Sequence, residues 1–100
     1  MGGAGCVSTV ANLAPGRIRS VLDAFDAGDT ARAARLQRRA IDLVARTMSA
    51  GLPGTVTVKG LLNALGLLSG PVRAPLRPAS PETVAALRAS YEQLVTEPSL

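Results

Sequence analysis

The chain has 100 residues, a net charge of +4, one cysteine and no histidine. That length allows one domain at most, and the lack of histidine excludes a Cys/His zinc site and a histidine-based catalytic triad. Only two residues are aromatic while 47% are hydrophobic, so the core must consist of Leu, Val, Ile and Ala, and Ala and Leu favour helices.

The first predicted element is a short strand at residues 4–10. The stretch from Ala4 to Val10 is largely apolar and partly β-branched, and glycines precede it. Such a run is typical of a strand buried on both faces of a parallel sheet. No later segment offers a partner strand, and a lone buried strand would leave its backbone N–H and C=O groups unpaired. The sequence therefore predicts a sheet that this chain does not complete.

Two helices are predicted between Pro15 and Ala50. Pro15 suits the first turn of a helix, Gly28 suits its C-cap, and Asp29 is a good N-cap for the next helix. Gly51-Leu52-Pro53-Gly54 ends that second helix. Helical spacing places one apolar face on each helix. The first face consists of Ile18, Val21, Leu22 and Phe25, and the second includes Leu36, Ala40, Leu43, Val44 and Met48.

Two further helices are predicted in the second half of the chain. The third carries apolar residues at helical spacing and ends at Gly66; residues 69–79 hold three prolines and predict an extended loop. Ser80-Pro81-Glu82 combines a cap, an N1 proline and a first-turn acid, which together start the fourth helix. Its tail is expected to fray from Thr96. The apolar faces are Val58, Leu61, Leu62 and Leu65, and then Val84, Leu87, Tyr91 and Leu94.

Few residues suggest a catalytic or ligand-binding role. Gly3 and Gly5 match the first two glycines of a dinucleotide-binding loop, but Ser8 occupies the third position and no strand precedes the loop. Lys59 is the only lysine; it could be a Schiff-base nucleophile, although an ion pair or a snorkelling side chain is favoured because no general base accompanies it. Cys6 is expected to be a small buried hydrophobic residue rather than a nucleophile.

The only dense group of basic residues is Arg32, Arg35, Arg38 and Arg39. A solvated helix face is the favoured interpretation, and nucleic-acid binding, the rival, lacks the interleaved aromatic residues of a stacking surface. Asp23 and Asp26 are expected to be solvated. No signal peptide and no membrane-spanning run is recognisable, so the cytoplasm is the expected location.

Three stretches, in this order, resemble the dihydrodipicolinate synthase/N-acetylneuraminate lyase family. The first, Gly2-Gly3-Ala4-Gly5-Cys6-Val7-Ser8 with Asn12 and Pro15, is similar to the pattern Gly-Gly-x-Gly-Val-Ile-Ser, x-Asn-x-x-Pro. The second is Ala27-Gly28-Asp29 before an Ala/Arg/Leu-rich helix. The third comprises Val58-Lys59, Leu65-Gly66-Leu67, Val72-Arg73-Ala74-Pro75-Leu76 and Pro78.

The resemblance implies the fold class: mostly α, being the C-terminal part of a (β/α)₈ TIM barrel plus an appended C-terminal helical region. Residues 1–28 would be the last barrel strand and its helix, and residues 29–100 the helical region. A complete barrel needs about 250 residues. The start at Met1 therefore predicts a gene fragment, a wrongly assigned start or a remnant.

The resemblance also implies a pyruvate-dependent Schiff-base aldolase or lyase as the parent protein, with pyruvate and an aldehyde as substrates and a homotetramer as the assembly. No cofactor, metal, nucleic acid or membrane is expected. The family's catalytic lysine and tyrosine would lie upstream of the matched segment, so the chain alone is expected to be inactive. Only Val7 carries over, as the residue whose main chain lines the pyruvate site. The alternative is a stand-alone helical binding or oligomerisation module.

Overall fold

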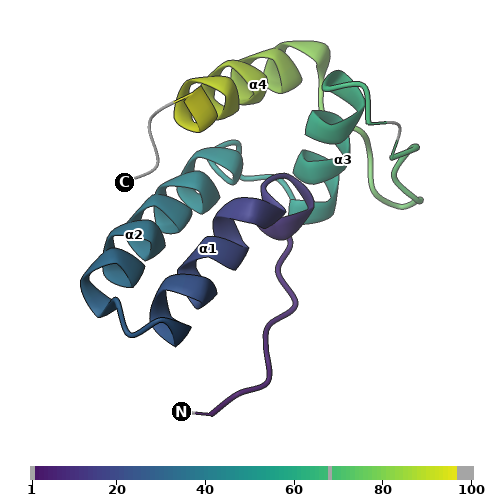
Figure 1. Ribbon diagram of the computed structural model, residues 1–100. Helices are drawn as coiled ribbons and strands as arrows, with labels where there is room; N and C mark the ends of the chain where they lie inside the picture. Colours follow the sequence, from purple (N-terminus) through teal and green to yellow (C-terminus); the bar gives the residue numbers. More distant parts are fainter. Residues whose placement is uncertain (1, 68, 97–100) are drawn as a thin grey trace.

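The computed structural model describes residues 2–67 and 69–96, and in these ranges the chain is helical, without a strand (Figure 1). Fraying was predicted from Thr96; Thr96 is the last residue of α4, and residues 97–100 lie outside the described residues. The elements, in chain order, are the 3₁₀ turn η1 (Val10–Asn12) and the helices α1 (Pro15–Asp26), α2 (Thr30–Thr47), α3 (Gly54–Ala64) and α4 (Pro81–Thr96).

The predicted strand at residues 4–10 is not formed among the described residues of this structure. Residues 2–7 have no regular secondary structure, and Val10 belongs to the 3₁₀ turn instead. A strand obtains its hydrogen bonds from a neighbouring strand, and the described residues supply none. Val10 is nevertheless 3% exposed. In this structure the apolar end of the stretch packs against helices.

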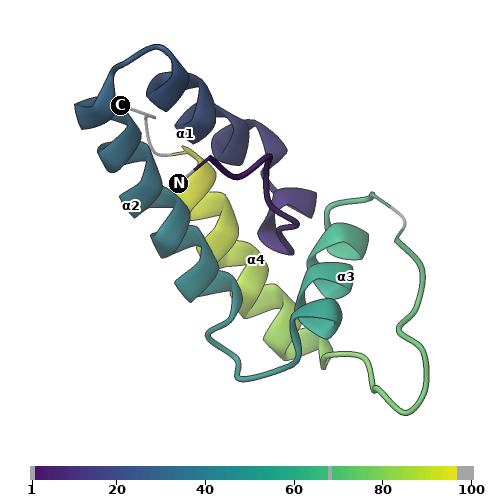
Figure 2. The same ribbon diagram turned by 90° about the horizontal axis from the view of Figure 1, so that it is seen from below.

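Helices α1 and α2 form an antiparallel hairpin, visible in two perpendicular views (Figures 1 and 2). Gly28 adopts a φ of 81°, the left-handed conformation that glycine accepts readily. Asp29 caps α2 by accepting a hydrogen bond from the Arg32 backbone N–H at 3.0 Å. The predicted helix boundary at Gly28 and Asp29 is thus confirmed.

The buried faces of the hairpin differ from the predicted ones. In α1, Leu22 and Phe25 are exposed while Ala24 is buried, because Ala24 meets the small residue Ala33 and the hairpin closes over small side chains. In α2, the predicted Leu36, Ala40 and Leu43 are buried. Val44 is 43% exposed instead, and the burial of Ala33 and Thr47 was not predicted.

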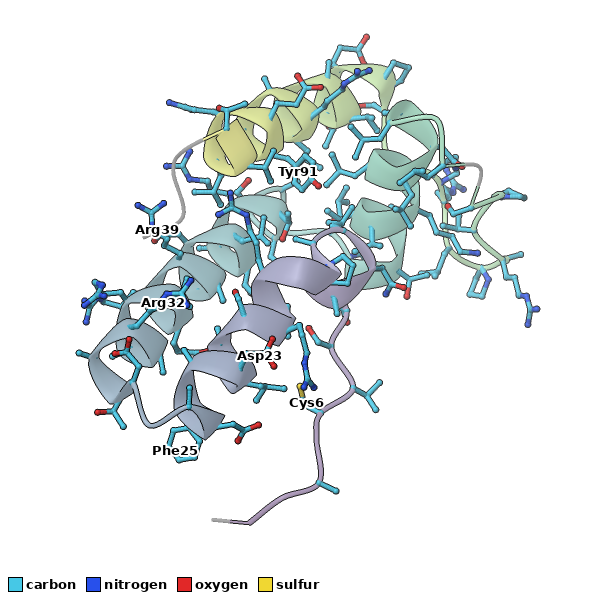
Figure 3. All side chains as sticks on the ribbon, viewed as in Figure 1. Cys6, Asp23, Phe25, Arg32, Arg39 and Tyr91 are labelled. Atoms are coloured by element: carbon cyan, nitrogen blue, oxygen red, sulfur yellow. The ribbon has the colours of Figure 1, made fainter. Side chains whose placement is uncertain are left out.

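Helix α4 contacts both α2 and α3 and so closes the core. One buried cluster joins Val10, Ala14, Leu43 and Leu94; a second joins Leu13, Val58, Leu61 and Leu87; Tyr91 packs against both. Tyr91 reaches inward from α4 (Figure 3), and its hydroxyl donates a hydrogen bond to the Leu13 carbonyl at 2.8 Å. The segment before α1 is therefore joined to the last helix.

The start of α4 agrees with the predicted cap at Ser80 and the predicted proline at the first helical position. Ser80 accepts a hydrogen bond from the Thr83 backbone N–H at 3.2 Å, and Pro81 begins α4. A Cβ at Gly60 would lie 3.2 Å from the Cγ2 of Val84, so α3 and α4 approach closely where glycine stands. Arg88 of α4 donates to the Ala64 carbonyl at the end of α3 at 2.9 Å.

Candidate functional site

Two hollows on the molecule bring polar side chains together. The first, called here the N-terminal groove, lies between residues 7–12, α3 and Ser69, and has a volume of about 360 Å³. It contains the two positions that the sequence singled out, Val7 and Lys59. It lies apart from the second hollow, with which it shares no lining residue.

The N-terminal wall of the groove is held by short-range hydrogen bonds. The Ser8 hydroxyl oxygen accepts from the Ala11 backbone N–H at 3.3 Å, and the Asn12 side-chain amide donates to the Thr9 carbonyl at 3.0 Å. These bonds hold the ends of η1, and Val7 lies before it at the rim of the groove, fully exposed. Val7 therefore borders the groove, while the predicted role of its main chain toward pyruvate stays a prediction.

Lys59 is a structural donor in this groove. Its ammonium Nζ donates a hydrogen bond to the Pro71 carbonyl at 2.9 Å, and its own carbonyl accepts from the Ser69 hydroxyl at 3.3 Å. Asn63, one turn further along α3, accepts from the Ser69 backbone N–H at 2.8 Å. No carboxylate or histidine lines the groove among the described residues. The geometry thus fits the non-catalytic interpretation, with a backbone carbonyl as the partner in place of an acidic side chain.

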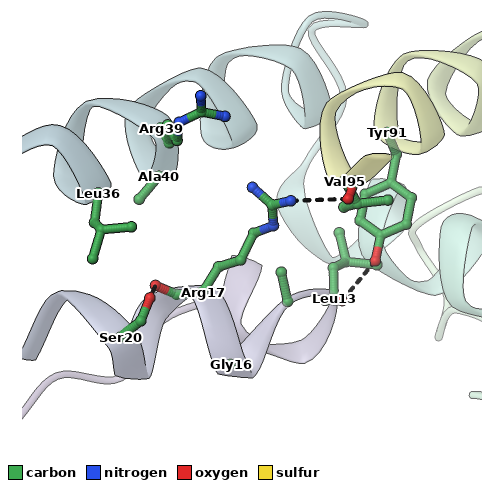
Figure 4. A pocket seen from close by; sticks show the side chains of 10 residues that line it. Leu13, Gly16, Arg17, Ser20, Leu36, Arg39, Ala40, Tyr91 and Val95 are labelled. Atoms are coloured by element: carbon green, nitrogen blue, oxygen red, sulfur yellow. Dashed lines mark hydrogen bonds between the residues drawn. The ribbon is translucent and has the colours of Figure 1, made fainter. Parts of the chain in front are cut away.

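The second hollow, called here the arginine cavity, lies between α1, α2 and α4 and has a volume of about 390 Å³ (Figure 4). Arg17 enters it from α1 and donates from Nη2 to the Val95 carbonyl at 2.9 Å. Arg39 enters from α2. The prediction of a solvated basic face is confirmed for Arg32, Arg35 and Arg38, which are exposed, but is wrong for Arg39, which is half-buried.

Sequence reasoning missed this cavity. The sequence contained one indication of it. Arg39 directly precedes Ala40 and lies three residues after Leu36, at the edge of the apolar stripe of α2. Side chains at such an edge turn toward neighbouring helices, whereas those on the opposite face point to solvent. Arg17, two residues after Pro15, carried no comparable signal.

The remaining candidate residues assemble no reactive site. Asp23 forms an ion pair with Arg19 at 2.9 Å on the surface of α1, and Asp26 is exposed. Cys6 is also exposed, in contrast to the predicted buried residue. Among the described residues there is no group of three potential metal ligands, and no described helix is long and apolar enough to cross a membrane.

Comparison with known proteins gives a consistent set of matches. The profile of the Dihydrodipicolinate synthetase family matches residues 1–94. The chain is 65% identical over 97 residues to 4-hydroxy-tetrahydrodipicolinate synthase 1 of Streptomyces coelicolor, covering 97% of this chain and 32% of that relative. It is 38% identical over 82 residues to 4-hydroxy-tetrahydrodipicolinate synthase of Methanococcoides burtonii, covering 82% and 28%. With N-acetylneuraminate lyase of Lactiplantibacillus plantarum the identity is 32% over 89 residues, covering 89% and 30%.

Proposed function

Because this chain belongs to the dihydrodipicolinate synthetase family, we propose that it forms the C-terminal helical part of a pyruvate-dependent Schiff-base aldolase or lyase of the 4-hydroxy-tetrahydrodipicolinate synthase type. The observation that carries the proposal is the 65% identity over 97 residues to the Streptomyces coelicolor synthase. The chain spans only about a third of the length of the relatives that it matches. The activity therefore belongs to a protein that also contains the other two thirds.

The exposed apolar side chains of α1 support this proposal. Leu22 and Phe25 are 43% and 64% exposed, and Phe25 lies at the end of α1 away from α4 (Figure 3). Large apolar side chains that share one side of a helix are usually covered by a partner surface. In the proposed protein, residues 1–28 are the last barrel strand and its helix, and this side of α1 covers the barrel. Residues 29–100 are the appended helical region.

The N-terminal groove gives a second support for the proposal. In a (β/α)₈ barrel, substrates bind at the C-terminal ends of the strands. Val7 belongs to the proposed strand and borders the groove. We assign to the main chain of Val7 the contact with pyruvate, as the resemblance implies. The second substrate is an aldehyde and the assembly a homotetramer, as the resemblance implies, and the proposed location is the cytoplasm.

A chimera tests the proposal directly. The barrel portion of the Streptomyces coelicolor synthase is joined to this chain at the matched boundary, and pyruvate-dependent consumption of an aldehyde substrate is measured. The expected result is a folded chimera that is active. Its control is the same barrel portion ending at the boundary, which is expected to lose activity. A chimera that folds but fails to turn over pyruvate would contradict the proposal.

A trapping experiment tests the inactivity of the chain by itself. The 100-residue chain is incubated with pyruvate and sodium borohydride, and its mass is measured. A Schiff base requires a nucleophilic amine with an activating environment, whereas the single lysine of this chain donates to the Pro71 carbonyl. No adduct is expected. A pyruvate-dependent adduct on Lys59 would overturn the assignment of the nucleophile to the other part of the protein.

A further inference from the structure

Part of the N-terminal groove is formed by the loop between α3 and α4. Among the described residues of that loop, Ser69 is the one that lines the groove. We propose that the Ser69 hydroxyl contacts the aldehyde substrate in this groove, and that Asn63 is the positioning residue that holds Ser69 there. The inference rests on the proposed function, because it places the second substrate in the groove that Val7 borders.

Asn63 binds the loop at two successive residues. Its side-chain oxygen accepts a hydrogen bond from the Ser69 backbone N–H at 2.8 Å, and its side-chain amide donates to the Gly70 carbonyl at 3.0 Å. An asparagine side chain can accept and donate at the same time, so it fits this pair of backbone groups. Lys59, one turn earlier on α3, donates to the Pro71 carbonyl at 2.9 Å. Three consecutive loop residues are therefore bound to two side chains of one helix.

These bonds fix the loop without building the core. Asn63 and Gly70 are exposed, and water competes for exposed hydrogen bonds, so the net gain in stability from each bond is small. The loop makes a wide excursion away from the helices before it reaches α4 (Figure 2), and loops of this kind are mobile unless they are bound. The main consequence of the bonds is therefore the position of Ser69 in the groove.

The Ser69 hydroxyl has no strong hydrogen bond of its own. Its oxygen lies 3.3 Å from the Lys59 carbonyl oxygen and 3.4 Å from the Asn63 side-chain oxygen. Bonds between a hydroxyl and an oxygen acceptor usually measure about 2.5–3.0 Å. A serine hydroxyl has one proton to donate, so the two long contacts are alternatives for the same proton. A substrate oxygen at a shorter distance in the groove would take this proton over.

The rest of the groove suits a small molecule that is partly polar. Val58 and Leu62 of α3 contribute apolar surface, and Ser8 contributes a second hydroxyl. The Ser8 oxygen accepts from the Ala11 backbone N–H at 3.3 Å, which leaves its proton for another acceptor. The volume of about 360 Å³ lies within the range of small-ligand sites, about 300–1,000 Å³. Ser69 therefore favours an aldehyde whose chain carries an oxygen acceptor over one with a purely hydrocarbon chain.

The test measures kcat and the KM of both substrates in the chimera, with the aldehyde used there. Ser69→Ala and Asn63→Ala should each raise the KM for the aldehyde by about three- to tenfold, which corresponds to one hydrogen bond. The kcat and the KM for pyruvate should stay unchanged, because a bond present in both the ground state and the transition state affects KM alone.

The matched control is Arg88→Gln. It removes another bond at the end of α3, the one to the Ala64 carbonyl at 2.9 Å, but Arg88 does not line the groove. Its KM for the aldehyde should equal that of the parent chimera. An equal rise in the control would overturn the assignment of Ser69 and Asn63, because it would show that general loosening of the loop is sufficient.

A double variant tests whether Asn63 acts through Ser69. If it does, Asn63→Ala combined with Ser69→Ala should raise the KM for the aldehyde no further than Ser69→Ala alone. Additive rises would overturn the positioning role. Ser69→Thr keeps the hydroxyl and should stay close to the parent; the same rise as in Ser69→Ala would contradict the contact with the aldehyde.

The proposed function and this inference can fail separately. An inactive parent chimera would overturn both, whereas an active chimera in which Ser69→Ala and Asn63→Ala leave the KM for the aldehyde unchanged would overturn this inference alone. Amide exchange in the 100-residue chain gives a measurement that is independent of activity. Asn63→Ala should accelerate exchange of the Ser69 amide, which loses its acceptor, and leave the amides of α2 unchanged. Unchanged exchange at Ser69 would contradict the positioning role.

Discussion

Replacing Tyr91 by Phe isolates the hydrogen bond that joins α4 to the segment before α1. The hydroxyl of Tyr91 donates to the Leu13 carbonyl at 2.8 Å, and the ring packs against both main core clusters. Phenylalanine keeps the ring and removes only the hydroxyl. A typical hydrogen bond contributes about 0.5–1.5 kcal/mol, and a buried acceptor left without its donor costs more. The expected loss in the free energy of unfolding is therefore about 1–2 kcal/mol.

The measurement is urea denaturation of the two proteins, supported by thermal unfolding. For a domain of about 100 residues, a change of 1 kcal/mol lowers Tm by about 4–8 °C. The control is Glu92→Gln, which neutralises the neighbouring residue and its exposed ion pair with Arg88 at 2.8 Å; surface pairs contribute about 0–1 kcal/mol, so this variant should change little. If Tyr91→Phe unfolded at the same urea concentration as the parent, the hydrogen bond would have no role in joining α4 to the N-terminal segment.

Three further comparisons test the packing and the backbone. Leu43 is 0% exposed and Val44 is 43% exposed. In urea denaturation, Leu43→Ala should therefore lower the free energy of unfolding by about 2–5 kcal/mol, and Val44→Ala should lower it far less. Similar losses for the two variants would contradict the assigned faces of α2. Gly28→Ala should lower the free energy of unfolding by about 1–2 kcal/mol, because φ is 81° at this position. At Gly16 an added Cβ would meet nothing within 4 Å, so Gly16→Ala should leave the stability unchanged or raise it. Calorimetry measures both changes. Lys59→Met removes the bond to the Pro71 carbonyl, so amide exchange should accelerate in the loop after α3 while global stability falls by no more than about 1 kcal/mol; unchanged exchange would show that the bond does not hold the loop.

The sequence by itself determined where helices begin and end, because those signals are local. Gly28 and Asp29 ended one helix and started the next, and Ser80 with Pro81 started the last. A capping side chain bonds to backbone groups two or three residues away, so a few neighbouring residues contain all the information. The family was also evident from motif order alone, and the match over residues 1–94 confirms it.

Tertiary structure decided which apolar side chains are buried. Ala24 turned inward and Phe25 stayed exposed, although both lie in one helix and only Phe25 belongs to the predicted stripe. Helix α1 packs against α2 with the side that carries small residues, because small side chains allow the two helices to approach closely. That choice depends on the partner helix, and periodicity in one segment does not contain it.

Tertiary structure also decided the two features that depend on distant residues. Residues 4–10 have the composition of a buried strand, but strands need hydrogen bonds from neighbours, and the described residues supply none. Arg17 and Arg39 are far apart in the chain, and only the packing of α1, α2 and α4 brings them to one cavity. Composition and spacing describe what a segment can form; the neighbours that complete its hydrogen bonds and surround its charges determine what it becomes.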